Sequence, residues 1–239
     1  LRAPVEAGET TSAVIAFGQG AEGETDGVKL FLNGELADSD AYSGGIGGND
    51  EPLVIGATQR RSGDGVADRV ENVFQGEIHQ IELYDQPLAA DQIQTLADDG
   101  LAAAAEPAPD PAPEPEPETS DGGPLMHYRG FGAPGETVDN EAGEAHDGVV
   151  QDDGWTLVED ASAFDIDAGT LSVVFNADDV QTTQGLFSRD SSGYDGGGHL
   201  TVTLDDGDIV VRLQSTGGNT YLRAPVEAGE TTSAVIAFG

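Results

Sequence analysis

Apolar residues occur along the chain in short stretches that often alternate with polar residues, and turn-forming residues separate the stretches. Such alternation places the apolar side chains on one face of a β-strand. The clearest example is the pair of stretches at residues 199–204 and 209–214, with Asp206-Gly207 between them. A second pair flanks Asn33-Gly34, and such pairs are the strongest short hairpin signal. The pattern predicts many short antiparallel strands.

Two segments depart from simple alternation. The apolar positions change parity between Ile78 and Ile81, which predicts a β-bulge there. Residues 87–98 instead follow a helical period, and their apolar side chains fall on one face. These are Leu88, Ile93, Leu96 and Ala97. We expect one short helix, ended by Asp98-Asp99-Gly100.

The chain opens and closes on the same segment. Residues 1–18 and 222–239 both read LRAPVEAGETTSAVIAFG, so that Leu1 corresponds to Leu222 and Gly18 to Gly239. This period is far longer than that of a solenoid, so we interpret the repeating unit as a domain plus a linker, and the chain as a window of a longer tandem array. A duplicated edge strand, or a circular permutation with overlapping ends, is the alternative.

A Pro-rich segment divides the chain. Residues 102–124 alternate Pro with Ala and acidic residues, which predicts an extended polyproline-II spacer or a disordered one. Residues 1–101 then form the C-terminal part of one sandwich, and residues 125–239 the N-terminal part of the next. We expect each part to complete its sheets with segments of adjacent copies, through the duplicated strand: Ala13, Val14, Ile15, Ala16, Phe17, Ala234, Val235, Ile236, Ala237 and Phe238.

Composition narrows the possible partners. The chain has 9 Lys plus Arg against 45 Asp plus Glu, a formal net charge of −36. This charge repels nucleic acids and anionic membranes, so neither is expected as a partner. The absence of cysteine excludes disulfides and thiolate metal sites. No apolar run approaches the roughly 20 residues of a membrane-spanning helix.

Read with 125–221 placed before 1–101, the chain resembles a known family. The resemblance is carried by VDNEAGEAHDGVV, GTLSVVF, GLFSRDSSGYDGGGHLTVTLDDGDIVVRLQS, GVKLFLNGEL, PLVIGA and FQGEIHQIELYDQPLAADQI. Together these resemble the LamG-like jelly-roll domains of the concanavalin A-like lectin/glucanase superfamily. The resemblance implies an all-β antiparallel sandwich with one short C-terminal helix per unit, the units being joined by Pro-rich linkers. In particular, the unit looks like the copies found in very large secreted or surface proteins of marine bacteria. His79 and Ala89 depart from the family, which often has Asp and Ser there.

Two Asp-containing loops are candidate calcium sites. Asp190 and Asp195 lie in one Gly-rich segment, and Asp64 and Asp68 lie in another. Calcium requires several oxygen ligands, which Asp side chains and loop carbonyls supply, and LamG-like domains commonly bind calcium at one rim. Solvated acidic loops are the alternative. For two weaker clusters we favour turn capping; these are Asp139 with Asp147, and Asn49 with Asp50.

Catalysis and sugar binding have weaker signals. Glu77, His79 and Glu82 resemble the E-x-D-x-x-E strand of retaining glucanases, but His replaces the central Asp, so we expect no enzyme activity. The aromatic residues that could stack on sugars are Trp155, Tyr42, Tyr194 and Tyr221, with a core role favoured for Trp155. We expect the rare Arg60, Arg61 and Arg189 to pair with acidic groups. The histidines lack zinc-site spacing; they are His79, His127, His146 and His199, the last expected to be packed or hydrogen-bonded.

These features support two functional hypotheses. The first is a structural repeat unit of an extracellular or cell-surface bacterial filament, with neighbouring copies of the same repeat as partners. The alternative is a calcium-dependent adhesin module that binds glycans or surfaces. The number of repeats, and whether neighbouring units are covalently joined, stay open.

Overall fold

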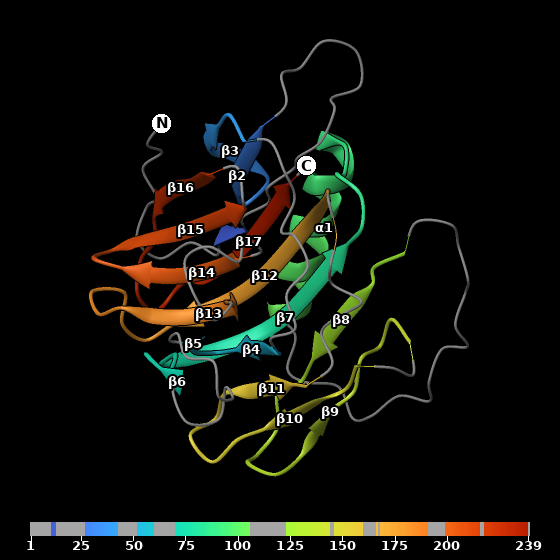
Figure 1. Ribbon diagram of the computed structural model, residues 1–239, viewed down its shortest axis with the longest axis vertical. Helices are drawn as coiled ribbons and strands as arrows, with labels where there is room; N and C mark the ends of the chain where they lie inside the picture. Colours follow the sequence, from blue (N-terminus) through green and yellow to red (C-terminus); the bar gives the residue numbers. More distant parts are fainter. Residues whose placement is uncertain are drawn as a thin grey trace.

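The computed structural model describes residues 11–12, 27–42, 52–59, 70–105, 123–143, 146–159, 166, 168–190, 199–215 and 218–238. Within these ranges the chain forms two β-sheets that pack face to face and one helix that lies behind the first sheet (Figure 1). The expected all-β antiparallel sandwich of jelly-roll type, with a single short helix, is confirmed.

Seven described strands form the first sheet, which we call the seven-stranded sheet. Across it run β3 (Glu35–Asp40), β2 (Val28–Leu32), β17 (Thr231–Phe238), β12 (Gly169–Ala177), β7 (Gly76–Tyr84) and β8 (Met126–Arg129), with β1 (Thr11–Ser12) beside β17. All the pairings in this row are antiparallel, whereas β1 pairs with β17 in parallel.

Eight described strands form the second sheet, the eight-stranded sheet, in which every pairing is antiparallel. Across it run β16 (Gly218–Pro225), β15 (Asp208–Ser215), β14 (His199–Asp205), β13 (Gln184–Arg189), β4 (Leu53–Ile55), β11 (Thr156–Val158), β10 (Gly148–Val150) and β9 (Thr137–Val138). A separate hairpin consists of β5 (Thr58–Gln59) and β6 (Val70–Glu71).

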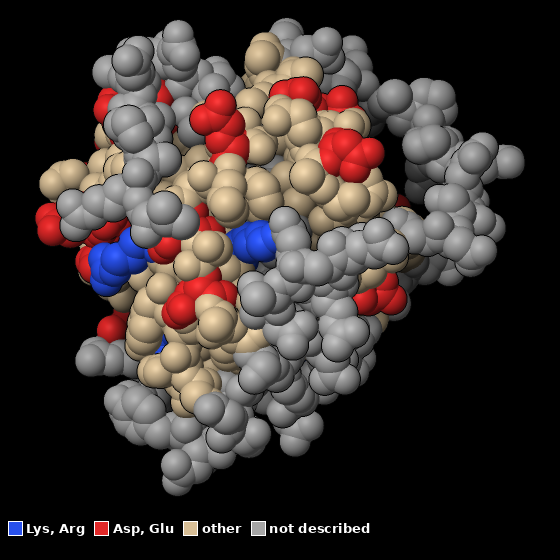
Figure 2. Space-filling model, turned by 90° about the horizontal axis from the view of Figure 1, so that it is seen from above, with Lys and Arg blue, Asp and Glu red and all other residues tan. Residues whose placement is uncertain are grey.

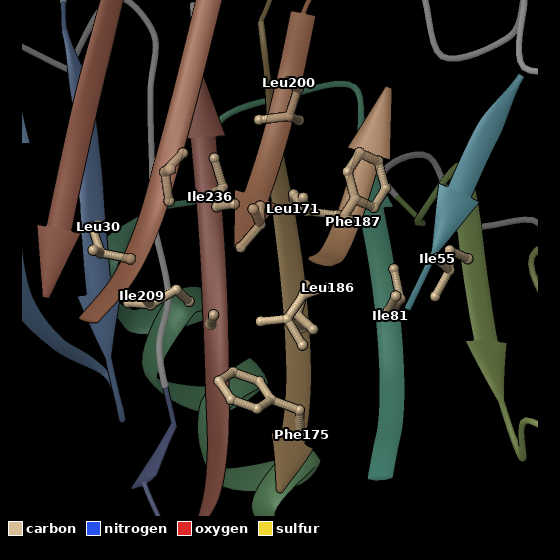
Figure 3. Packing of buried hydrophobic residues seen from close by; sticks show 14 of the residues in the cluster. Leu30, Ile55, Ile81, Leu171, Phe175, Leu186, Phe187, Leu200, Ile209 and Ile236 are labelled. Carbon is tan, nitrogen blue, oxygen red and sulfur yellow. The ribbon is translucent and has the colours of Figure 1, made fainter. Parts of the chain in front are cut away.

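The core lies between the two sheets, as Figure 3 shows. Alternate residues of each strand point inward, so that both inner faces are lined with aliphatic and aromatic side chains that exclude water. The fully buried members labelled in Figure 3 are Leu30, Ile55, Ile81, Leu171, Phe175, Leu186, Phe187, Leu200, Ile209 and Ile236. This layer is the main source of stability.

The predicted hairpins and bulge are confirmed. Asn33 and Gly34 join β2 to β3 with φ angles of 53° and 79°, and Asp206 and Gly207 join β14 to β15 with 53° and 83°. Positive φ at both central residues is what a type I′ hairpin turn requires. In β7, the register against β12 shifts by one residue, which leaves His79 as the extra residue of a bulge.

The helix α1 (Ala90–Ala105) covers the outer face of the seven-stranded sheet, against β17, β12 and β7. Its predicted apolar face is confirmed, because Ile93 and Ala97 pack with Leu88 against Val235. The Ala89 N–H donates to Gln92 Oε1 at 2.9 Å, so a glutamine side chain caps the start of the helix where the family often has serine.

The predicted end of this helix is wrong. The helix continues through Gly100 to Ala105, so its last turn takes in the first residues assigned to the linker. Gly100 is buried, and a Cβ atom there would lie 2.7 Å from Val174 Cγ2. Gly100 therefore permits close packing on the sheet, and the alanines after it favour the helix by intrinsic propensity. Linker residues 106–122 lie outside the described ranges.

The two parts of the chain form one sandwich, which corrects the expectation that each part needs an adjacent copy. The strands β2 and β7 pair with β17 and β12, and β4 lies between β13 and β11. Residues 27–105 and 123–238 therefore complete one another within a single chain. The physical reason is that the C-terminal copy of the duplicated segment provides the central strand that joins the two parts.

The C-terminal copy spans both sheets. Residues 222–225 form the end of β16 in the eight-stranded sheet, and residues 231–238 form β17. The side chains of Ala234, Val235 and Ile236 are fully buried, and the backbones of Ala237 and Phe238 pair with β12. Of the N-terminal copy, only Thr11 and Ser12 are described, so the predicted contacts of residues 13–17 lie outside the described ranges.

Candidate functional site

One of the predicted calcium residues, Asp190, lies at one end of the eight-stranded sheet. Asp190 directly follows β13, whereas Asp64, Asp68 and Asp195 lie outside the described residues. Near Asp190, β5 ends at Gln59 and β14 begins at His199. We call Gln59, Ser188, Asp190 and His199 the end network.

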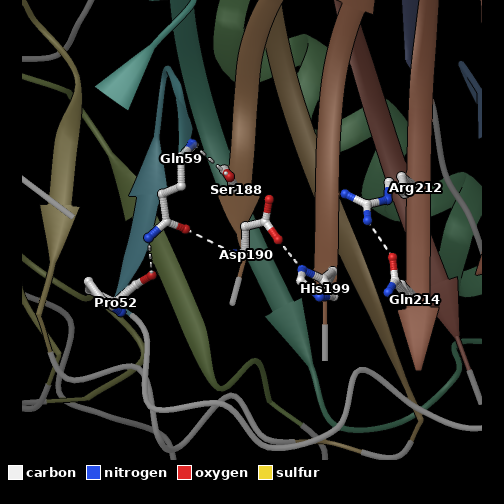
Figure 4. A network of polar contacts seen from close by, with 7 residues as sticks. All are labelled: Pro52, Gln59, Ser188, Asp190, His199, Arg212 and Gln214. Atoms are coloured by element: carbon white, nitrogen blue, oxygen red, sulfur yellow. Dashed lines mark hydrogen bonds and ion pairs between the residues drawn. The ribbon is translucent and has the colours of Figure 1, made fainter. Parts of the chain in front are cut away.

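Hydrogen bonds join the end network across three strands (Figure 4). The Asp190 N–H donates to Gln59 Oε1 at 3.0 Å, and the Gln59 N–H donates to Ser188 Oγ at 3.1 Å. The Asp190 carboxylate contacts Nδ1 of His199, whose side chain is buried, as expected for this histidine. Gln59 Nε2 also donates to the Pro52 carbonyl at 3.0 Å. These bonds fix the strand ends relative to one another.

The end network brings together the starting points of the two predicted calcium loops. Gln59 precedes residues 60–69, and Asp190 and His199 flank residues 191–198. The oxygens of Gln59 and Asp190 that enter the network already have partners. Among the described residues, no group of three or more His, Asp or Glu side chains is arranged to hold a metal. The network therefore joins the described residues that flank the two predicted loops.

Sequence analysis did not identify Gln59 or Ser188, because their partners lie 131 and 129 positions away in the chain. It also missed Arg212 and Gln214, which contact each other on β15. The alternation of these two polar residues with buried Val211 and Leu213 is the signal that would have placed them on the outer face.

One predicted aromatic residue is exposed on this outer face. Tyr221 of β16 is 52% exposed and pairs in register with Arg212. Tyr42 and Trp155 are buried, which confirms the core role favoured for Trp155, and Tyr194 lies outside the described residues. Among the described aromatic candidates, Tyr221 is therefore the one whose side chain is exposed.

The three residues that resemble a glucanase active strand, Glu77, His79 and Glu82, do not line one pocket. Glu77 and His79 line a pocket of about 790 Å³ with Phe74, Arg129 and Phe131, and the Glu77 carboxylate lies 3.6 Å from His79 Nδ1. Glu82 does not line this pocket and is only 6% exposed. It projects to the outer face of the seven-stranded sheet, opposite to the core residues Ile81 and Leu83, on the side that α1 covers.

Glu82 belongs instead to a buried polar cluster on β7 and β8. Its Oε1 lies 3.6 Å from His127 Nε2, and Glu141 Oε2 lies 3.5 Å from His127 Nδ1. Burial raises the pKa of Glu82, and burial together with the Arg129 charge lowers the pKa of His127 to about 4. Burial favours the neutral form of both groups, so the cluster is a structural arrangement.

The remaining candidates have structural roles or lie outside the description. The Asn140 N–H donates to Asp147 Oδ1 at 3.0 Å, which agrees with turn capping. Arg189 is buried at the end of β13. Asn49, Asp50, Arg60 and Arg61 are not among the described residues.

Comparison with known proteins adds one match. Residues 2–94 match the family model described as the concanavalin A-like lectin/glucanases superfamily, which confirms the resemblance for that segment. No curated protein and no solved structure matches the chain. The match and the sandwich fold support a carbohydrate-binding or structural module as the general class, of a kind that is typically extracellular and generally non-enzymatic. Among the described residues, no helix is both long and apolar enough to span a membrane.

Proposed function

We propose that this chain is the repeating structural module of an extracellular or cell-surface filament. Its residues 2–94 match the family model of the concanavalin A-like lectin/glucanases superfamily. One observation carries the proposal: residues 1–18 recur as residues 222–239, and the second copy includes β17, an interior strand of the seven-stranded sheet. One period, from Leu1 to Tyr221, contains the duplicated sequence once. In an array of such periods, each period therefore has the sequence of every strand of one sandwich.

The pairing of β17 with β2 supports a continuous array. In such an array the sequence after Phe238 would be that of residues 18–27, followed by the sequence of β2. This order makes the two strands consecutive, and consecutive strands joined by a short connection pair in antiparallel fashion. The structure has that pairing, with Ala234 opposite Leu32 and Ala237 opposite Lys29. The chain completes its sandwich without a neighbouring unit, so no incomplete sheet argues for an array. The proposal is therefore based on the repeated sequence.

One edge of each sheet and the net charge favour units strung along the chain over units stacked side by side. The edge strands β3 and β16 bridge the two sheets, because Asp38 accepts the Arg223 N–H at 3.1 Å and Asp40 accepts the Thr220 hydroxyl. A bridged edge is a poor template for a further strand. A net charge of −36 also makes neighbouring units repel one another, which keeps an array extended.

The test is the shape of proteins containing two, three and four periods. We expect electron microscopy and small-angle X-ray scattering to show unbranched strings, one globule per period, whose maximum dimension increases in proportion to the number of periods. A maximum dimension that stays constant, or a single merged globule, would contradict the proposal.

A second candidate function is calcium-dependent glycan binding. The end network favours it, because it joins the residues that flank the two Asp-containing loops, on the sheet that carries Tyr221. We expect calorimetry to detect calcium binding that Asp64→Asn and Asp68→Asn weaken at least tenfold, and a glycan array to give signals that a chelator abolishes and Tyr221→Ala reduces. Equal glycan signals with and without the chelator would rule out this candidate.

A further inference from the structure

The pocket beside the start of β7 has no role in the filament proposal. It has a volume of about 790 Å³ and lies where the start of β7, the end of β8, the last turn of α1 and the strands β4 and β11 meet. We propose that this pocket binds a small organic molecule through a primary ammonium group. The proposal is independent of the filament and of the two predicted calcium loops.

The chain forms this pocket by leaving part of one edge of β7 unpaired. The strand β8 pairs with β7 only from Gln80 to Leu83, and this pairing ends at Arg129 of β8. Gly130 then has a φ of 63°, a backbone conformation that favours glycine, and the strand stops there. Among the described residues, Gly76 to His79 therefore have no strand beside them on that edge, and they line the pocket. The pocket volume is within the range of small-molecule sites, about 300–1,000 Å³.

Two buried oxygen atoms in the pocket wall have no hydrogen-bond partner among the described residues. They belong to Gln80, which is 3% exposed, and Thr156, which is 1% exposed, and both residues line the pocket. The Gln80 side chain donates a hydrogen bond to the Glu82 carboxylate, which occupies its amide nitrogen and leaves Oε1 without a donor. Thr156 Oγ1 is also without a partner. Burying such oxygens unpaired is unfavourable, so they favour a ligand that donates hydrogen bonds.

The charges around the pocket favour a cation. Glu77 and Glu141 line it, and their side chains are 76% and 49% exposed, so both carboxylates are accessible. The last turn of α1 also lines the pocket and contains no basic residue, so the negative end of the helix dipole is not offset within that turn. Arg129 is the only lysine or arginine among the described lining residues. Negative charge therefore exceeds positive charge at the pocket.

Apolar side chains provide a surface for the carbon skeleton of the ligand. Ile55, Phe74, Ile78 and Phe131 line the pocket; Ile55 belongs to the core, and the other three pack against it. The faces of aromatic rings attract ammonium groups and also contact hydrocarbon. An inorganic cation fits less well, because it needs several oxygen ligands around one point, and the described residues contain no such acidic group. The combination fits an ammonium group on a small organic body.

Nuclear magnetic resonance titrations of the full chain test the binding. The probes are cyclohexylamine and glucosamine, and their neutral matches are cyclohexanol and N-acetylglucosamine, which lack the ammonium group. We expect at least one amine to bind saturably, one molecule per chain, and to shift the side-chain amide signals of Gln80. Its neutral match should bind more weakly by about tenfold. The amine that binds more tightly identifies the body as apolar or sugar-like. If neither amine binds saturably, or if amine and neutral match bind equally, the proposal is overturned.

Substitutions that remove one charge each locate the site. Glu77→Gln and Glu141→Gln remove pocket carboxylates, so we expect each to weaken amine binding by about two- to fivefold. Arg129→Gln removes a like charge and should strengthen binding by a similar factor. The matched control is Glu35→Gln, which removes an exposed carboxylate from β3 at the opposite edge of the sheet and should leave binding unchanged.

Two results of this series would overturn the proposal. If Glu35→Gln weakened binding as much as Glu77→Gln, the amine would be attracted diffusely to an acidic protein. If Arg129→Gln weakened binding, the pocket would prefer an anionic group.

Discussion

At the residue scale, the polar side chains at the end of the eight-stranded sheet are hydrogen-bonded to one another. His199 and Asp190 satisfy each other, and Gln59 connects strands that lie far apart in sequence. Burying such groups is unfavourable unless they find partners, so they fix the geometry of the strand ends. Glu82, which resembles a catalytic residue of the retaining glucanases in sequence, is buried in the structure, and its carboxylate lies 3.6 Å from His127 Nε2.

Gln59 is expected to stabilise the end of the eight-stranded sheet. Gln59→Leu removes the acceptor of the Asp190 N–H and the donor to the Pro52 carbonyl, so we expect the free energy of unfolding to fall by about 1–3 kcal/mol. The control is Gln94→Leu on the exposed side of α1, which should change it by less than about 0.5 kcal/mol. Urea unfolding measures both, and equal effects would argue against the end network.

His127 gives a pH dependence with a defined sign. Its pKa is about 4 in the folded chain, below the ordinary value of 6.5 that applies to the unfolded chain. Between these values the unfolded chain binds the additional proton, so the His127 contribution to stability is lost as the pH falls from 6.5 to 4. The raised pKa of Glu82 acts in the opposite direction, because its folded carboxyl group takes up a proton first on acidification.

We therefore expect His127→Gln to flatten the dependence of the unfolding free energy on pH between about 4 and 6.5, by at most about 3 kcal/mol across this range. Val149→Ala, at an exposed position, changes no ionisable group and is the control, so it should leave the slope unchanged. Urea titrations at several pH values measure the effect. An unchanged slope in the His127 variant would show that the histidine does not titrate with a lowered pKa.

At the scale of elements, local patterns predicted what local chemistry decides. The two hairpins were predicted from Asn33-Gly34 and Asp206-Gly207, which have positive φ in the structure. The bulge at His79 was predicted from the change in the alternation of apolar residues between Ile78 and Ile81. The end of the helix did not follow, because Gly100 was interpreted as a stop signal when its role is a close approach to Val174. That contact depends on tertiary packing, which a single sequence does not display.

Gly100→Ala separates these two interpretations. Alanine has the higher helix propensity, by about 1 kcal/mol, and would stabilise an unobstructed helix. The new Cβ would lie 2.7 Å from Val174 Cγ2, so we expect a net loss of about 1–3 kcal/mol in unfolding free energy. Combining the change with Val174→Ala should relieve part of the loss. A stabilised Gly100→Ala protein would show that α1 lies farther from the sheet.

At the scale of the whole molecule, the sequence predicted the sandwich but misjudged where its two parts would find their partner strands. The repeat at the two ends suggested that each part needed a neighbouring copy, yet β17 closes one sandwich within the chain. Both arrangements use the same strands and the same side chains, so local pattern cannot distinguish them. The candidate calcium loops were identified from their composition, but the network that brings their ends together was not.

Charge acts on the whole molecule as well. Figure 2 shows acidic side chains spread over the face in view, with few basic ones between them. This distribution and the net charge of −36 make the folded chain repel itself. We expect the unfolding temperature to rise between about 0.02 and 0.5 M sodium chloride, as the Debye length falls from roughly 20 to 4 Å. A lower unfolding temperature at the higher salt concentration would contradict this view.

The central claim is that each period of the sequence, the length from Leu1 to Tyr221, supplies one complete sandwich closed by the duplicated strand. Stretching a single protein of four periods by force spectroscopy tests it most directly. The account predicts unfolding steps of one size whose number increases by one with each added period, each releasing about 70 nm for roughly 200 residues. Steps of half that length, or a number of steps that does not follow the number of periods, would contradict it.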